Sequence, residues 1–159
     1  MADRPPLDPA ALDAWMGIAL EEARAATDHG DVPIGAVVVR IADGAVIARR
    51  HNERERTGDP TAHAEVLALR DAAAATGSWR LDGHVLVVTL EPCPMCAGAT
   101  LAARIPVVAF GAADPKAGAL GSLYHFGSDP RLNHGCAVVD GVRAAEAAAL
   151  LQDFFADRR

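Results

Sequence analysis

Three side chains that can hold a metal ion occur in two short and well-separated motifs. His63 lies two residues before Glu65, and Cys93 and Cys96 form a Cys-x-x-Cys pair. Imidazole nitrogen and cysteine thiolate are typical zinc ligands, and a catalytic zinc site keeps three protein ligands and one open position for water. The spacing therefore predicts one zinc ion per chain, held in a site that is open for hydrolysis.

Glu65 indicates what such a site would do. A carboxylate two residues after a ligand can reach a metal-bound water without ligating, take its proton, and return protons to a ring nitrogen and a leaving amine. The alternative for a lone glutamate is an exposed place in the first turn of a helix, which the helix dipole favours. Cys136 stands in an apolar stretch, which is typical of a small buried side chain rather than a fourth ligand. These residues indicate a zinc-dependent hydrolase with Glu65 as the catalytic proton carrier.

The first half of the chain predicts a helix, a strand pair and a second helix. Hydrophobic residues recur at helical spacing from Leu12 to Ala23, and that helix should end near His29 and Gly30. The ranges 34–39 and 45–48 predict antiparallel strands joined by a Gly-containing turn. Asp59 and Pro60 then predict the cap of a helix whose face Val66, Leu69 and Ala73 continue.

The second half alternates strands with helices. We expect buried strands at 84–90 and 105–110 with a helix at 93–103 between them, then a long loop over 111–135. A last strand at 136–139 and a helix after Gly141 complete the order. This alternation favours an α/β layer structure with helices on both faces of a mixed sheet. His63 and Cys93 then stand at two helix starts, where free backbone N–H groups and the positive dipole end favour thiolates and a metal-bound hydroxide.

Composition limits the class of protein. The 159 residues are 51% hydrophobic and 23% charged, which fits one globular domain spanning residues 1–159. The net charge of −6 argues against a surface that attracts nucleic acid everywhere. A local basic cluster is nevertheless present at Arg49, Arg50, Arg54 and Arg56. No apolar run is long enough to span a membrane and no signal-peptide core follows Met1, so we expect a cytoplasmic protein with no membrane partner.

Both metal-ligand motifs match the signature of zinc nucleobase deaminases, H-x-E followed by P-C-x-x-C. Stretches along nearly the whole chain resemble the bacterial tRNA-specific adenosine deaminases, a family of the cytidine/deoxycytidylate deaminase superfamily. The range 124–130 matches this family least. The resembling stretches are 31–36 (DVPIGA), 59–65 (DPTAHAE), 89–99 (TLEPCPMCAGA), 114–118 (DPKAG), 121–123 (GSL), 132–134 (LNH) and 153–155 (DFF).

The resemblance implies a fold, an assembly and a reaction. The fold is the cytidine deaminase-like three-layer α/β sandwich, in which helices cover both faces of a five-stranded mixed sheet, and the enzyme works as a homodimer. The implied substrate is the wobble adenosine of a tRNA anticodon, in bacteria chiefly that of an arginine tRNA, and the product is inosine. A zinc-activated hydroxide attacks the ring carbon that bears the amine, ammonia leaves, and Glu65 acts first as base and then as acid.

The resemblance also assigns residues to the adenine pocket. Asn52 would hydrogen-bond the flipped adenine, and Val32, Pro33 and Ala62 would line the pocket around it. Asn52 has the alternative of only shaping its loop, and Pro33 that of only starting a strand. Glu91 could position a zinc ligand or a backbone amide from behind the metal loop, or it could lie on the surface.

Two further segments resemble those that contact the anticodon loop. Asp114 and Lys116 match the tRNA-contacting loop, although an Asp-Pro pair followed by Lys is also ordinary turn chemistry. Phe155, with Arg158 and Arg159, matches the aromatic and basic C-terminal helix, where bases could stack on the ring. The alternative for Phe155 is packing in the core. His125 and His134 lie outside the spaced motifs, so we expect loop or capping roles for them.

Two rival functions remain at this point. A deaminase of free guanine, cytosine or their nucleosides would share the zinc signature and the fold, and the acidic net charge fits it. A non-catalytic zinc module or a thiol redox protein could also use Cys93 and Cys96, but neither explains the pairing of His63 with Glu65.

Overall fold

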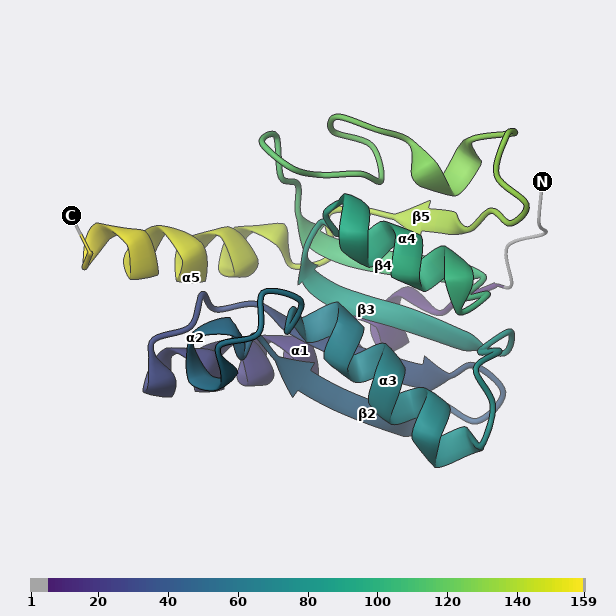
Figure 1. Cartoon of the computed structure of the whole chain (residues 1–159), viewed down its shortest axis with the longest axis horizontal. Coiled ribbons are helices and arrows are strands. Elements are labelled where there is room, and N and C mark those ends of the chain that lie inside the picture. The colour runs from purple at the N-terminus through teal and green to yellow at the C-terminus, as the bar shows by residue number, and fades with distance from the viewer. Residues whose placement is uncertain (1–5, 159) are drawn as a thin grey trace.

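The computed structural model describes residues 6–158 of the chain (Figure 1). Five strands and five α-helices, with two short 3-10 helices, follow one another along these residues. Their order is α1 (Pro9–Ala26), η1 (Thr27–His29), β1 (Gly35–Arg40), β2 (Val46–His51), α2 (Arg54–Thr57), α3 (Ala64–Thr76), β3 (His84–Leu90), α4 (Pro94–Ala102), β4 (Val107–Ala112), η2 (Phe126–Ser128), β5 (Ala137–Val139) and α5 (Ala144–Ala156).

The five strands form one mixed sheet in the order β2-β1-β3-β4-β5. β1 pairs with β2 and β3 in antiparallel fashion, whereas β3, β4 and β5 are parallel to one another. The parallel pairs are joined by crossovers, and α4 is the crossover between β3 and β4. The predicted five-stranded mixed sheet is confirmed.

Helices cover both faces of this sheet, as predicted (Figure 1). One core lies between the sheet and the pair α3 and α4, and includes Leu69, Leu86 and Phe110. The other lies beneath α1 and α5, and includes Met16, Leu20 and Val87. Side chains of β3 alternate between the two cores because successive residues of a strand point to opposite faces. The sequences of the parallel strands β3 and β4 are continuous apolar runs because both faces of these strands are buried.

The start of β1 is packed tightly against α1. Asp8 caps α1 by accepting a hydrogen bond from the N–H of Ala10 at 3.0 Å. A Cβ atom at Gly35 would lie 1.9 Å from the carbonyl oxygen of Ala19, so only glycine fits there. This contact fixes the distance between α1 and the first residue of β1.

Several elements differ from the sequence predictions. β2 continues to His51 because its pairing with β1 runs on to the partners Gly35 and His51. The short helix α2 was not predicted, and it lies between the second predicted strand and Asp59. The predicted Asp59 helix cap was wrong: α3 begins at Ala64, because the Asp59 carboxylate accepts the N–H and the hydroxyl of Thr61 and closes a turn instead.

The strand β4 also begins and ends two residues later than predicted, because its parallel pairing with β3 extends to Leu90 and Ala112.

In the part of the chain that the structure describes, no helix is both long enough and apolar enough to cross a membrane.

Candidate metal centre

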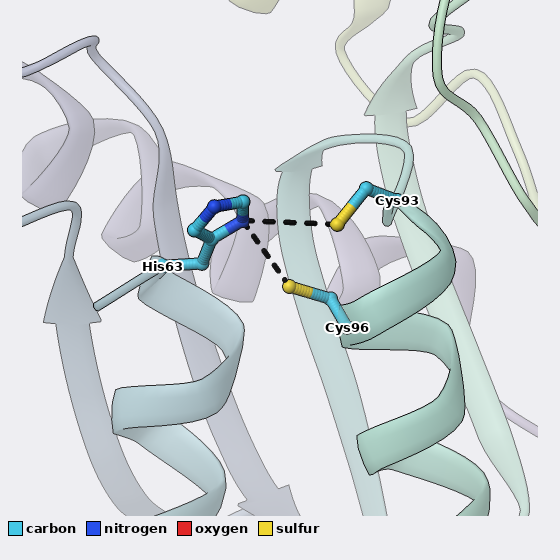
Figure 2. Close-up of side chains that lie close together, drawn as sticks. All are labelled: His63, Cys93 and Cys96. Atoms are coloured by element: carbon cyan, nitrogen blue, oxygen red, sulfur yellow. Dashed lines mark hydrogen bonds between the residues drawn. The ribbon is translucent and has the colours of Figure 1, made fainter. Parts of the chain in front are cut away.

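His63, Cys93 and Cys96 lie together where the N-termini of α3 and α4 meet (Figure 2). His63 is the residue that precedes α3, Cys93 precedes α4, and Cys96 lies in the first turn of α4. The His63 Nδ1 atom is 3.4 Å from Cys96 Sγ and 3.8 Å from Cys93 Sγ. The structure therefore brings together all three ligands that the spacing predicted, although His63 and Cys93 are 30 positions apart in the sequence.

The three donor atoms fit a tetrahedral zinc ion. Zinc binds imidazole nitrogen at about 2.0 Å and thiolate at about 2.3 Å, which places nitrogen and sulfur roughly 3.6 Å apart in a tetrahedron. The two observed separations lie on either side of that value. Within residues 6–158 the potential metal-ligand group holds these three residues and no fourth, which leaves one tetrahedral position for water or substrate.

The two sulfur atoms differ in their affinity for protons. Hydrogen bonds from the Cys96 thiol, the His63 ring and the Cys96 backbone N–H lower the pKa of Cys93 to about 4, against the effect of burial. The adjacent Cys93 sulfur and burial raise the pKa of Cys96. A hydrogen bond with Cys93 raises the pKa of His63. Cys93 is thus a thiolate at neutral pH, which is the form that binds metal.

Glu65 is buried beside this group and is not one of its three ligands. Its side chain lies in the first turn of α3 and is 4% exposed. Burial raises the pKa of its carboxyl, and a hydrogen bond from the Cys96 thiol offsets only part of that rise. The exposed first-turn alternative for Glu65 was wrong, because the carboxyl faces the ligands rather than solvent.

The segments that carry Val32, Pro33, Asn52 and Ala62 converge on the start of α3. The buried Asn52 side chain accepts a hydrogen bond through Oδ1 from the N–H of Ala64 at 2.9 Å. Its backbone N–H donates to the carbonyl of Ile34, and the next residue donates to the carbonyl of Ala62. Pro33 and Ala62 are buried and Val32 is half-buried. Asn52 therefore shapes its loop, and within the described chain its amide nitrogen keeps its hydrogen-bonding capacity for another partner.

Sequence reasoning missed the role of Asp31, which holds the unpredicted helix α2 in place. The Asp31 carboxylate is 1% exposed and accepts the backbone N–H groups of Glu55 and Arg56 at 2.8 and 3.2 Å. His29 Nδ1 lies 2.6 Å from the same carboxylate. Burial opposes ionisation, but these hydrogen bonds outweigh it and lower the pKa of Asp31. An aspartate before a strand carries no local signal of this role, which arises only from tertiary contact.

Glu91 lies where β3 runs into α4, and Asp114 and Lys116 lie in the loop that follows β4. Glu91 is 2% exposed, so its surface alternative was wrong. Asp114 builds its own turn by accepting the N–H groups of Lys116 and Ala117 at 3.0 and 3.2 Å. The Lys116 side chain is exposed. The turn interpretation of Asp114 is thus confirmed, and Lys116 is left at the tip of the turn.

The C-terminal helix α5 extends beyond the edge of the sheet (Figure 1). Phe154 is the buried aromatic residue, whereas Phe155 is 48% exposed, so the core-packing alternative for Phe155 was wrong. The Arg158 guanidinium lies 3.5 Å from the centre of the Phe154 ring and close to Gly30, which precedes the segment of Val32 and Pro33. Arg159 lies outside the described residues.

Most of the arginine cluster is neutralised by neighbouring carboxylates. Arg49 pairs with Glu21, Arg50 with Asp71 and Glu53, and Arg56 approaches Glu53. Arg54 forms no ion pair with any residue between 6 and 158. Its positive charge opposes the rise in the pKa of His63, which the hydrogen bond with Cys93 dominates.

The remaining histidine and cysteine candidates lie away from the ligand group. His134 Nε2 is 3.1 Å from the carbonyl oxygen of Ile105, and His125 precedes η2. Cys136 is buried, and burial raises its pKa to about 11, so it remains a thiol at neutral pH. Within the described range neither histidine nor Cys136 joins the three metal ligands.

Comparison with known proteins gives one consistent class. The sequence model of the MafB19-like deaminase family matches residues 11–159. A tRNA-specific adenosine deaminase of Bacillus subtilis (strain 168) is 47% identical over 147 residues, which cover 92% of this chain and 90% of the relative. A solved structure from a study of A-to-I editing by tRNA deaminases at the wobble position matches with a TM-score of 0.83 at 47% identity, covering 87% of this chain and 99% of that one. A guanine deaminase from Nitrosomonas europaea matches with a TM-score of 0.76 at 27% identity, covering 98% of both chains.

Proposed function

The chain belongs to the MafB19-like deaminase family and to the tRNA-specific adenosine deaminases, and from that premise we propose that it converts the wobble adenosine of a tRNA anticodon to inosine. The observation that carries the proposal is the group of three metal ligands with a buried carboxyl beside it. Water is consumed and ammonia is released: a bond from carbon 6 of the adenine to oxygen forms and the bond to the exocyclic nitrogen breaks.

His63, Cys93 and Cys96 are the residues that would hold a single zinc ion. A zinc ion bound there lowers the pKa of a water molecule toward neutrality and so supplies a hydroxide nucleophile. Cys93 is already deprotonated at neutral pH, which favours metal binding. The helix N-termini that carry these residues add positive potential on the same side.

Glu65 would carry the protons of the reaction. Its raised pKa makes the carboxylate a better proton acceptor than a carboxylate with an ordinary pKa. The proton would pass to the ring nitrogen next to carbon 6, and a second proton would leave with the amine. Its place beside Cys96, outside the ligand group, keeps the carboxylate free for this exchange.

Asn52 would recognise the adenine, with Val32, Pro33 and Ala62 as pocket walls. The Oδ1 atom of Asn52 is engaged by Ala64, which fixes the orientation of the amide, and the NH2 group can then donate to a ring nitrogen of the base. Val32, Pro33 and Ala62 are wholly or partly buried around the start of α3 and contribute apolar surface.

Three exposed side chains would meet the rest of the anticodon loop. Phe155 offers an exposed ring on which an unpaired base can stack. Lys116 and Arg54 are exposed cations, and phosphate contacts from such cations supply much of the affinity for RNA. Asp114 would act through the turn that presents Lys116. An arginine tRNA is the substrate that we expect, and a tRNA substrate places the reaction in the cytoplasm.

We expect the enzyme to act as a homodimer. Exposed apolar side chains concentrate on α4 and on the segment between β4 and β5, namely Met95, Leu123, Tyr124 and Leu132. A hollow between α4 and this segment is lined by Leu101, Phe126 and Leu132. A second copy packed on this face would cover it. Sedimentation velocity should show a dimer that Leu132→Asp weakens.

Deamination of free guanine is the second candidate, because a guanine deaminase shares the fold over nearly its whole length. The two functions separate in one assay with zinc-loaded protein. The protein is given one of three substrates: an anticodon stem-loop with adenosine at the wobble position, free guanine, or free cytosine. Mass spectrometry then quantifies the nucleosides and bases. We expect inosine from the stem-loop and no turnover of the free bases. Turnover of guanine without inosine would assign the second function.

A further inference from the structure

The carboxylate of Glu91 is surrounded by hydrogen-bond donors of a single loop, residues 113–122. Its Oε1 atom accepts the N–H of Asp114 at 3.1 Å and the hydroxyl of Ser122 at 2.5 Å. Its Oε2 atom accepts the N–H groups of Leu120 and Ser122 at 3.1 and 3.0 Å. Four donors from three residues thus converge on one buried side chain, so the loop is folded around the carboxylate.

The fit of the loop around Glu91 leaves no spare room. A Cβ atom at Gly118 would overlap both carboxylate oxygens of Glu91, so glycine is required where the loop crosses the side chain. Burial opposes ionisation of Glu91, but the hydrogen bonds from Ser122, Asp114 and Leu120 outweigh it, and its pKa lies below the usual range. Glu91 is a fixed anion, and the positive ends of the loop's N–H groups neutralise it.

Glu91 also ties this loop to the metal-binding segment. Its own N–H donates to the carbonyl of Ala112 at 2.9 Å, continuing the β3–β4 pairing. The next residue, Pro92, accepts the N–H of Ala119 at 2.9 Å, and Cys93 follows directly. The loop is therefore attached on both sides of Glu91 to the strand end that carries a metal ligand.

The outer part of the loop presents a single cation to solvent. Lys116 is the only lysine in the chain, and it is exposed at the tip of the turn that Asp114 closes. Its position depends on Asp114 and on the loop's attachment to Glu91, because the N–H of Asp114 is one of the four donors. A cation on a loop that is attached to the metal-binding segment is suited to a phosphate of an RNA strand that enters the site.

We infer that Glu91 is a positioning residue for RNA binding: its buried carboxylate clamps residues 113–122 so that Lys116 meets the RNA backbone beside the metal centre. This inference rests on the proposed function for the identity of the RNA. Glu91 touches neither the substrate nor the metal, so it acts on the substrate affinity rather than on the chemical step.

Glu91→Gln is a selective test because the side chain keeps its size. In either orientation of the glutamine amide, its NH2 group replaces an oxygen that accepts at least one backbone N–H. If it replaces Oε1 it faces Asp114, and if it replaces Oε2 it faces both Leu120 and Ser122. No rotation restores all four bonds. Ser122→Ala is a milder second variant that removes only the hydroxyl donor.

The experiment measures kcat, KM and zinc content of the zinc-loaded protein on an anticodon stem-loop, together with stem-loop binding by fluorescence anisotropy. Loss of one hydrogen bond to a charged acceptor corresponds to about a tenfold rise in KM for Glu91→Gln. We expect a smaller rise for Ser122→Ala, with kcat and zinc content near wild type in both. Leu20→Ala, in the core on the other face of the sheet, is the control for lost stability and should leave KM unchanged.

Two readouts do not need activity. Amide hydrogen exchange at Asp114, Leu120 and Ser122 should accelerate in Glu91→Gln and not in Leu20→Ala. Modification of Lys116 by an amine-reactive reagent should be blocked by the stem-loop in the wild type and much less in Glu91→Gln. Binding and KM like those of wild type in Glu91→Gln, or a loss of kcat at constant KM, would overturn the inference. A wild-type protein that binds the stem-loop but forms no inosine would overturn the proposed function alone.

Discussion

Two buried glutamates stand within two residues of a metal ligand, and the groups around their carboxyls differ. Glu65, in the first turn of α3, is 4% exposed and burial raises the pKa of its carboxyl. Glu91, between β3 and α4, is 2% exposed, yet four donors from the loop hold its pKa below the usual range. Low exposure of the side chain thus accompanies a raised pKa at Glu65 and a lowered pKa at Glu91.

The difference shows that burial alone does not define a catalytic carboxylate. What matters is whether the protein supplies donors to the charged form. Three backbone N–H groups and the Ser122 hydroxyl donate to the Glu91 carboxylate, so this side chain is suited to hold structure. The donors to Glu65 are its own backbone N–H and the Cys96 thiol, and they do not offset the effect of burial on its pKa. Glu65 also lies beside the metal ligands, so its carboxyl is placed for proton exchange.

The largest effect should follow from removing a metal ligand, because the proposed reaction needs the bound zinc ion. Cys96→Ala should lose zinc and lower inosine formation below detection, measured by elemental analysis and by nucleoside mass spectrometry. Cys136→Ala is the matched control, since this thiol is buried but lies outside the ligand group, and it should keep both zinc and activity. Zinc retained at full occupancy in Cys96→Ala would remove that residue from the ligand set.

Glu65→Gln should have the next largest effect. Loss of a general acid–base group lowers kcat by about 10² to 10⁴. Zinc content and binding of the stem-loop should stay near wild type, because Glu65 is not a ligand. Full activity in this variant would contradict the role of Glu65 as proton carrier.

Glu91→Gln and Glu65→Gln should differ in their effect on the stability of the fold. In metal-free protein at pH 7, Glu91→Gln should lower the free energy of unfolding by about 2 kcal/mol, because it disrupts hydrogen bonds to a charged acceptor. Glu65→Gln should leave it unchanged or raise it, because a poorly compensated buried carboxyl is replaced by a neutral group. Urea denaturation measures both. A large loss of stability in Glu65→Gln would mean that its carboxylate is held as Glu91 is.

Asp31 extends the comparison to acid pH, because it resembles Glu91 in being buried and well supplied with donors. Its pKa is lower in the folded than in the unfolded protein, so the carboxylate adds stability above its ordinary pKa of about 4 and loses it as pH falls through the folded value. The difference in unfolding free energy between wild type and Asp31→Asn should be constant from pH 7 to 5 and shrink below roughly pH 4. If the difference in unfolding free energy stayed constant below pH 4 as well, Asp31 would not have a lowered pKa in the folded protein.

The smallest effect should come from Arg54, whose charge is not neutralised within the described chain. Arg54→Ala should raise KM for the stem-loop several-fold and reduce its dependence on salt, because one phosphate contact is lost. Arg50→Ala serves as the control, since Arg50 is already paired with Asp71 and Glu53. Equal effects of the two substitutions would show that the ion pairs do not decide which arginine meets RNA.

The metal centre was predictable from the sequence because its signals are local. His63, Glu65, Cys93 and Cys96 are spaced within two short motifs. Hydrophobic periodicity also indicated the two helices that follow, although the cap of α3 was predicted at Asp59 and the helix begins at Ala64. The sheet followed from the same periodicity, since β3 and the helix α4 after it match the predicted ranges closely.

The supporting residues were not predictable because distant partners determine their roles. The start of α3 depends on Asn52, and α2 depends on Asp31, more than 20 residues earlier in the chain. Glu91 becomes a fixed anion only through donors 23 to 31 residues later. Neither the propensities nor the spacing of the neighbouring residues distinguishes these side chains from polar side chains on the surface.

Sequencing of unfractionated bacterial tRNA after incubation with the zinc-loaded protein tests the proposed function most directly, because inosine is read as guanosine at the edited position. Free guanine is included in the same reaction, and the Glu65→Gln protein is treated in parallel. We predict a change from adenosine to inosine at the wobble position of an arginine tRNA, none with Glu65→Gln, and intact guanine. Unchanged tRNA together with consumption of guanine would contradict the assignment of this site to tRNA.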